Sequence, residues 1–198
     1  MDIRQNRFVV IEGIDGAGKS TIADLLAATA NMRCFETPQE PFSIIKQAVL
    51  EQGSPLARLL FFMAANAQVA ETVTSLLVTR DVILVRYVWS TVAYHAAIEN
   101  VPVIELMPML EPLLSRIILP EFVIFMDVDR EEQQQRLRVK QDDKLQKRLN
   151  ISDDFQKRLK QAYYDSFSSI PITYEVIDTT GKEASDIAQM VRQMVISV

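Results

Sequence analysis

The chain has 198 residues, of which 48% are hydrophobic and 24% charged, and its formal net charge is −5. This length fits one domain spanning residues 1–198, and it is sufficient for a full core without disulfides. The single cysteine, Cys34, excludes an intramolecular disulfide, and the acidic balance argues against a nucleic acid polymer or an anionic membrane as partner. Because the first apolar stretch, residues 8–11, stops at Glu12, no targeting or membrane-spanning segment is expected and the protein is predicted to be cytoplasmic.

The first half of the chain alternates short apolar runs, which predict buried strands, with longer amphipathic stretches, which predict helices. In chain order these are a strand at 8–11 (FVVI), a helix at 21–30, a weak strand at 32–35, helices at 43–51 and 56–79, and a strand at 82–85 (VILV). The second of the two adjacent helices restarts after Gly53, and Pro55 is suited to its first turn.

The second half continues the alternation and completes the predicted sheet. In chain order it contains helices at 91–99 and 104–115, a strand at 122–126 (FVIFM), a charged helix from 130, a helix from 152 to about 167, a strand at 174–177 (YEVI) and a closing helix at 183–196. The helix at 104–115 is expected to bend or restart near Pro108 or Pro112. Strands separated by helices imply parallel pairing, and continuous apolar strands imply a sheet covered on both faces. The predicted class is therefore a three-layer α/β fold with about five parallel strands.

The strongest motif is the segment GIDGAGKS at residues 13–20, which matches the phosphate-binding pattern G-x-x-x-x-G-K-[ST] in full. A predicted strand runs into it and a predicted helix runs out of it, so backbone N–H groups and the positive end of the helix can surround phosphate oxygens. Lys19 can reach the β- and γ-phosphates, and the hydroxyl of Ser20 can ligate Mg²⁺. The residues expected to bind a nucleoside triphosphate are Gly13, Gly16, Ala17, Gly18, Lys19, Ser20 and Thr21.

The wider segment IEGIDGAGKST at residues 11–21 resembles the thymidylate kinase family. Further segments resemble motifs of that family in order and spacing: LFF…Q at 60–68, RY…S…AY at 86–94 and PEFVIFMDVD at 120–129. The resemblance covers nearly the whole chain and implies a P-loop kinase fold with strand order 2-3-1-4-5, a lid at about residues 136–152 and a homodimer packed through helices. It also implies the reaction, transfer of the γ-phosphoryl group of ATP with Mg²⁺ to a deoxynucleoside monophosphate, above all dTMP.

The resemblance assigns residues to the acceptor nucleotide. Asp15 matches the position whose carboxylate binds the 3′-hydroxyl of the sugar, and Arg86 matches the one that holds the acceptor phosphate, for which a planar guanidinium is suited. Tyr94 would lie under the deoxyribose and exclude a 2′-hydroxyl, although a core position on a helix face explains it nearly as well. The remaining positions that match the acceptor site are Pro41, Phe62, Asn66 and Ser90.

Basic residues gather between residues 130 and 160, where the family has its lid. Cations that close over the γ-phosphoryl group stabilise the negative charge that spreads over its oxygens during transfer. The phosphate loop of this chain has no arginine, and the family then takes its catalytic arginine from the lid, where Arg138 is the first candidate and Arg136 and Arg148 come next. A solvated charged helix explains most of these charges equally. The expected catalytic set is Lys19, Arg86, Arg138 and Asp15.

The chain departs from the family next to the metal. Val85 stands where the family has an aspartate near Mg²⁺, just before Arg86. Ser20, the phosphates and water would then hold the ion, with Glu12 or Asp127 as helpers. If this arrangement fails, the alternative is a nucleotide-binding protein with little catalysis.

The chain also departs from the family around the acceptor base. Asn66 replaces the arginine that reads the thymine edge, and Gln39 replaces the arginine before Glu40-Pro41. Replacing an arginine by asparagine removes a charged donor and adds an acceptor. A kinase of another nucleoside monophosphate or of a deoxynucleoside therefore stays open as an alternative.

Overall fold

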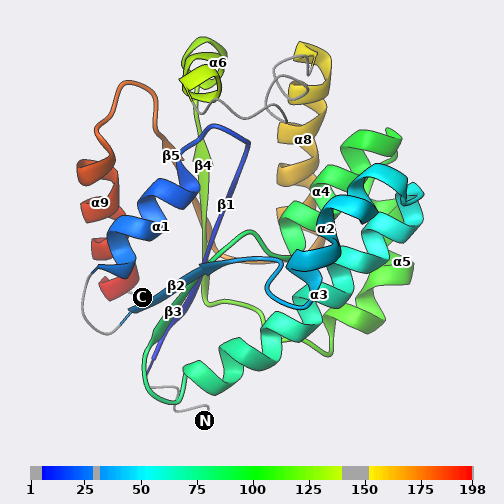
Figure 1. Ribbon diagram of the computed structural model, residues 1–198, viewed down its shortest axis with the longest axis horizontal. Coiled ribbons are helices and arrows are strands. Elements are labelled where there is room, and N and C mark those ends of the chain that lie inside the picture. Colours follow the sequence, from blue (N-terminus) through cyan, green and yellow to red (C-terminus); the bar gives the residue numbers. More distant parts are fainter. Residues whose placement is uncertain (1–5, 29–31, 140–151, 198) are drawn as a thin grey trace.

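A five-stranded parallel sheet with the order β2-β3-β1-β4-β5 forms the centre of the protein. The computed structural model describes residues 6–28, 32–139 and 152–197 (Figure 1). The strands are β1 (Phe8–Gly13), β2 (Met32–Glu36), β3 (Asp81–Val85), β4 (Phe122–Asp127) and β5 (Tyr174–Asp178). The observed order confirms the predicted one, and it places β1, which leads into the phosphate loop, between β3 and β4.

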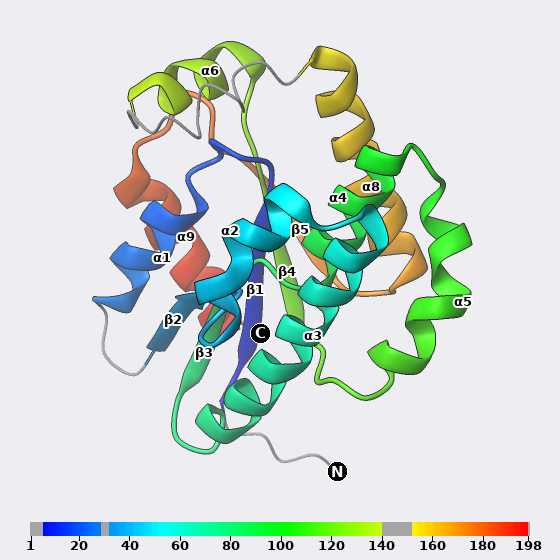
Figure 2. The same ribbon diagram turned by 45° about the vertical axis from the view of Figure 1, so that its right-hand side comes forward.

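Helices cover both faces of the sheet, as the continuous apolar strands predict. Helices α1 (Lys19–Ala27) and α9 (Ala184–Ser197) lie on one face, and α3 (Pro55–Leu76), α4 (Val88–Glu99) and α8 (Asp153–Ser169) lie on the other (Figure 1). Helix α2 (Phe42–Gln52) and helix α5 (Val103–Leu114) lie outside that second layer (Figure 2). The remaining helix, α6 (Arg130–Val139), crosses the end of the sheet where β1 and β4 finish.

Two helices differ from their predicted form. Helix α5 continues through Pro108 and Pro112 instead of restarting, because its buried face, which includes Leu106 and Leu110, keeps its full length packed against the core. Helix α4 begins at Val88 rather than at residue 91, because the side chain of Glu12 satisfies backbone N–H groups at its start. A buried carboxylate from a distant strand can cap a helix, and the local pattern of the helix does not predict it.

The N-terminus of α3 follows the sequence prediction closely. Pro55 occupies the first turn, and the Ser54 side chain accepts a hydrogen bond of 3.3 Å from the amide of Ala57. Among the described residues, α3 is the one helix with the length and apolar composition that a membrane span requires. Such a helix is weak evidence for a membrane, because core helices pass the same test; here Leu59, Val69 and Val73 of α3 are fully buried against the rest of the fold.

Replacing Gly13 by alanine is expected to destabilise the fold by at least about 2 kcal/mol. A Cβ atom at this last residue of β1 would lie 2.1 Å from the backbone oxygen of Met126 on β4, and the φ of +140° disfavours any side chain. Gly181→Ala is the matched control, since its φ is +65° but no atom lies within 4 Å of the added Cβ; its expected cost is about 1 kcal/mol. Denaturant unfolding compares the two variants, and an equal cost for both would contradict the close approach of β1 to β4.

Candidate active site

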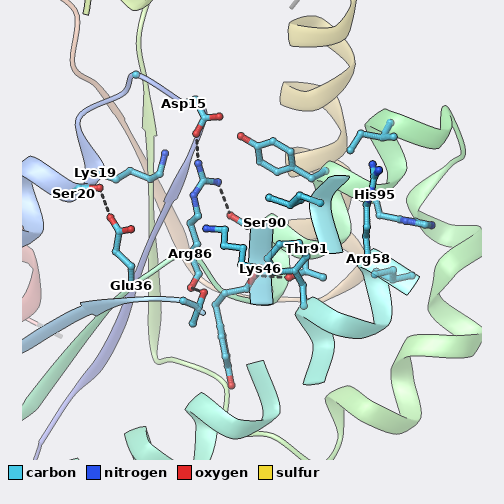
Figure 3. A pocket seen from close by; sticks show the side chains of 18 of the residues that line it. Asp15, Lys19, Ser20, Glu36, Lys46, Arg58, Arg86, Ser90, Thr91 and His95 are labelled. Carbon is cyan, nitrogen blue, oxygen red and sulfur yellow. Dashed lines mark hydrogen bonds and ion pairs between the residues drawn. The ribbon is translucent and has the colours of Figure 1, made fainter. Parts of the chain in front are cut away.

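A cavity of about 320 Å³ opens beside the phosphate loop, between the sheet and helices α2, α3 and α4. Asp15, Lys19 and Ser20 of the loop line one end, while Arg58 and His95 line the other (Figure 3). Cations outnumber carboxylates in its wall, where Lys19, Lys46, Arg58 and Arg86 stand against Asp15 and Glu36. A phosphorylated ligand is therefore favoured there despite the acidic chain.

The side chain of Lys19 is folded back onto the phosphate loop. Its ammonium nitrogen donates hydrogen bonds to the backbone oxygens of Gly13, at 2.9 Å, and Ile14, at 2.6 Å. Burial and, to a smaller extent, the nearby Arg86 lower the pKa of Lys19 to about 7, against the opposing effect of Asp15. Gly18, with a φ of 90°, precedes the first turn of α1 and turns the loop into the helix.

Helix α6 holds the loop from the other side. The side-chain amide of Gln133 donates a hydrogen bond of 2.6 Å to the backbone oxygen of Asp15. Arg136 reaches Gly16 O at 3.4 Å and Thr179 O at 2.7 Å, so it joins the loop to the segment that follows β5. The sequence analysis missed Gln133, because one glutamine in a charged helix carries no signal of its own.

Arg86 and Asp15 form an ion pair at the centre of the cavity (Figure 3). The guanidinium also lies 3.3 Å from the hydroxyl of Ser90 and 5.3 Å from the centroid of the Tyr94 ring. Arg86 adopts a left-handed backbone conformation with a φ of 66°, which is uncommon outside glycine and points to a functional constraint. The structure thus brings together four residues that the sequence analysis assigned to the acceptor: Asp15, Arg86, Ser90 and Tyr94.

Glu12 is fully buried beneath this cluster. Its carboxylate accepts hydrogen bonds from the backbone N–H of Tyr87, at 2.8 Å, from the backbone N–H of Ser90, at 3.1 Å, and from the Ser90 hydroxyl. Burial raises its pKa, and the hydrogen bonds from Ser90 and Tyr87 oppose that rise. Tyr163 of α8 completes the network with its hydroxyl 2.8 Å from that of Ser90.

The two carboxylates that the sequence analysis offered as helpers for Mg²⁺ are therefore occupied. Glu12 holds the start of α4, and Asp127 accepts hydrogen bonds from the ammonium of Lys160, at 2.9 Å, and from the amide of Val128, at 2.8 Å. The carboxylate that does face the loop is Glu36, which accepts a hydrogen bond from Ser20. The sequence analysis did not single out Glu36.

The far end of the cavity is built by α2, α3 and α4. Arg58 and His95 lie there (Figure 3), and Lys46, Phe62 and Thr91 also line the cavity. Burial lowers the pKa of His95, so a neutral imidazole is favoured at neutral pH. The Nε of Arg58 is buried without a hydrogen-bond partner. The cavity wall therefore combines an aromatic side chain, Phe62, with polar side chains such as Thr91 and His95, a combination that suits a nucleotide base.

Asn66 and Pro41 are placed differently from the other predicted acceptor residues. Asn66 is buried between α3 and α4, outside the cavity wall, and its amide donates a hydrogen bond of 3.0 Å to the hydroxyl of Thr91. Pro41 is exposed at the N-terminal end of α2, also outside the wall. Asn66 therefore does not line the cavity, but it contacts Thr91, which does.

The predicted lid lies largely outside the described residues. Arg138 is exposed in the last turn of α6 and does not line the cavity. Arg136 engages the loop and Thr179, as described above. Arg148 and the rest of residues 140–151 lie in the part of the chain that the structure does not describe.

The fold and the cavity define a P-loop kinase that acts on a small phosphorylated acceptor. The chain belongs to the thymidylate kinase family, because the family model for thymidylate kinase matches residues 11–191. A thymidylate kinase of Bifidobacterium longum (strain NCC 2705) is 31% identical over 189 residues, covering 87% of this chain and 89% of that protein. A probable thymidylate kinase of Methanococcus vannielii is 27% identical over 201 residues, covering 92% and 91%.

Solved structures agree on the fold. The thymidylate kinase of Candida albicans superposes with a TM-score of 0.71 at 21% identity, covering 97% of this chain and 92% of that chain. The thymidylate kinase of Ehrlichia chaffeensis superposes with a TM-score of 0.69 at 22% identity, covering 96% and 98%. Both matches extend over nearly the entire length of each chain.

Binding of ATP is expected to draw a proton onto Lys19. Its pKa is about 7 in the free protein, and nearby phosphates raise that pKa because they favour the charged ammonium. Between the pKa of Lys19 in the free protein and its higher pKa in the ATP complex, the complex holds more protons than the free protein. The affinity for ATP therefore falls as the pH rises through this window.

Titration calorimetry at about pH 8, in buffers of different ionisation enthalpy, measures this proton uptake. The control is Lys19→Arg, whose guanidinium stays protonated in both states, so its uptake should vanish. Binding heats for the unaltered protein that do not depend on the buffer would contradict a neutral Lys19 in the free protein.

Proposed function

We propose that the protein transfers the γ-phosphoryl group of ATP to dTMP, giving ADP and dTDP. The observation that carries the proposal is the Arg86–Asp15 pair, which joins the end of β3 to the phosphate loop inside one cavity and lies beside Tyr94. Membership of the thymidylate kinase family supports the same donor and acceptor.

Each of these groups has a separate task in the proposed reaction. Lys19, freed from the backbone oxygens of the loop, neutralises the β- and γ-phosphates of ATP. Arg86 binds the phosphate of dTMP and orients its oxygen toward the γ-phosphorus. Asp15 accepts a hydrogen bond from the 3′-hydroxyl, and Tyr94 packs against the deoxyribose. Arg138, in the last turn of α6, would supply the further cation at the transferred group.

The residues present fit a Mg²⁺ ion beside ATP. The donor set at the loop is the Ser20 hydroxyl with a facing carboxylate, and hard oxygen ligands of this kind suit Mg²⁺. A bound Mg²⁺ ion would neutralise charge that develops on the phosphate oxygens. Ser20 would hold it, with phosphate oxygens and water in the remaining positions.

A homodimer formed through α3 is part of the proposal. Leu60, Ala64 and Ala67 are exposed at helical spacing on α3, and they border a groove shared with Leu113 of α5. An apolar stripe of this kind is typical of a helix-packed interface between two copies of a chain. Light scattering distinguishes a dimer from a monomer.

We also propose a cytoplasmic location, for which the acidic composition and the single cysteine are the support.

Incubation with Mg²⁺, ATP and a panel of nucleoside monophosphates is expected to yield dTDP with higher kcat/KM than any other product. The panel includes dUMP, dCMP and TMP with a 2′-hydroxyl, and the nucleoside thymidine is tested beside them. Chromatography separates the products. Lys19→Ala should lower kcat by about 100-fold or more, because the charge on the transferred phosphoryl loses its principal counter-charge in the loop. Robust turnover of another acceptor without turnover of dTMP would contradict the proposal.

Arg58 is proposed to read the base edge in place of the arginine that Asn66 replaces. Arg58 lines the cavity wall, and its planar guanidinium carries hydrogen-bond donors that suit a carbonyl oxygen of thymine. Arg58→Ala is expected to raise the KM for dTMP by about tenfold, with the KM for ATP unchanged. The control is Arg80→Ala, an exposed arginine beyond the other end of α3. An unchanged KM for dTMP in Arg58→Ala would exclude this role.

A further inference from the structure

Glu36 lies where a metal ligand of the phosphate loop is needed. It is the last residue of β2, and its carboxylate accepts a hydrogen bond from the hydroxyl of Ser20 (Figure 3). Both side chains are exposed and line the same cavity. Ser20 is the loop residue whose hydroxyl ligates Mg²⁺ in this kind of nucleotide site, so Glu36 already lies at hydrogen-bond distance from the first ligand.

The sheet register relates Glu36 to the position where the family aspartate is missing. In the parallel pairing of β2 with β3, Glu36 is the partner of Val85. Val85 is 1% exposed and apolar, so it offers no ligand. Neighbouring strands are about 4.8 Å apart, and a glutamate side chain is one methylene longer than an aspartate. A carboxylate that starts on the adjacent strand can therefore reach the region that an aspartate at position 85 would serve.

The carboxylates at the other strand ends have partners of their own. Glu12 binds the start of α4, Asp127 binds Lys160, and Asp15 pairs with Arg86. Asp178, at the end of β5, accepts hydrogen bonds from the amide and hydroxyl of Thr180, at 2.9 and 2.6 Å. Among the described strand ends, Glu36 is thus the carboxylate directed at the loop hydroxyl.

We propose that Glu36, together with Ser20, is this chain's contribution to the coordination of Mg²⁺, in place of the aspartate that Val85 has displaced. The inference rests on ATP as the donor in the proposed function. A carboxylate beside the phosphates of ATP repels them unless a cation lies between, so Glu36 is favourable at this place only in a metal-bound complex. Mg²⁺ typically takes one or two carboxylates together with substrate phosphates and water, which matches this donor set.

The test compares ATP binding with Mg²⁺ and with EDTA, by calorimetry and without an acceptor. Mg²⁺ is expected to increase the affinity for ATP by some factor in the unaltered protein. In Glu36→Gln this factor should be about tenfold smaller. The affinity of this variant in EDTA should stay equal or increase, because a negative charge facing the phosphates is gone. Glu40→Gln, an exposed glutamate outside the cavity wall, is the matched control and should keep the full gain from Mg²⁺.

A second variant tests whether a carboxylate on β3 can replace the one on β2. The double variant Glu36→Gln/Val85→Asp removes the carboxylate from the end of β2 and places one at the end of β3. In the folded double variant the increase in ATP affinity with Mg²⁺ should be restored. A folded double variant without that gain counts against the proposal.

Two results with the single variant overturn the inference. One is a full gain from Mg²⁺ in Glu36→Gln, and the other is an equal loss of affinity with Mg²⁺ and with EDTA, which is the pattern of a purely structural contact to Ser20. Because no acceptor is present, a failure to phosphorylate dTMP in the panel would leave this result standing and would affect the acceptor assignment alone. If the unaltered protein binds ATP no better with Mg²⁺ than with EDTA, the inference fails together with the assignment of the donor.

Discussion

The buried carboxylate of Glu12 is the interaction on which the site depends. It lies one residue before the phosphate loop and accepts hydrogen bonds from the backbone N–H groups of Tyr87 and Ser90. These bonds fix the start of α4, and Arg86 lies directly before that start in its left-handed conformation. One carboxylate therefore sets the spacing between the loop that would hold ATP and the arginine that would hold the acceptor phosphate.

The distribution of charge explains how an acidic chain binds a polyphosphate. The formal net charge is −5, yet cations outnumber carboxylates in the cavity wall. Lys19 loses part of its charge through burial, and its pKa of about 7 keeps the repulsion of Arg86 small until phosphates arrive. Helix α6 adds rigidity from the opposite side, since Gln133 and Arg136 both bind backbone oxygens of the loop.

The sequence predicted the strands and the loop well, because continuous apolar runs and the phosphate-binding motif depend on local spacing, whereas the order of the strands came from the family resemblance. It also predicted the gathering of Asp15, Arg86, Ser90 and Tyr94 through the family resemblance. It could not predict Glu36 as the partner of Ser20, since that depends on the register of β2 with β3. The contacts of Asn66 with Thr91 and of Gln133 with the phosphate loop could not be predicted for the same reason, because each contact joins elements that are far apart in the chain.

The proposed reaction requires that one cavity receives donor and acceptor together, with the Arg86–Asp15 pair between their phosphates. The most direct measurement is the binding of a compound in which adenosine and thymidine are joined by a polyphosphate chain. Calorimetry should show one such molecule bound per chain, with affinity higher than that of ATP or dTMP alone, and competition should show that it displaces both. A compound that displaces ATP but leaves dTMP binding unaffected would show two separate sites and contradict the account.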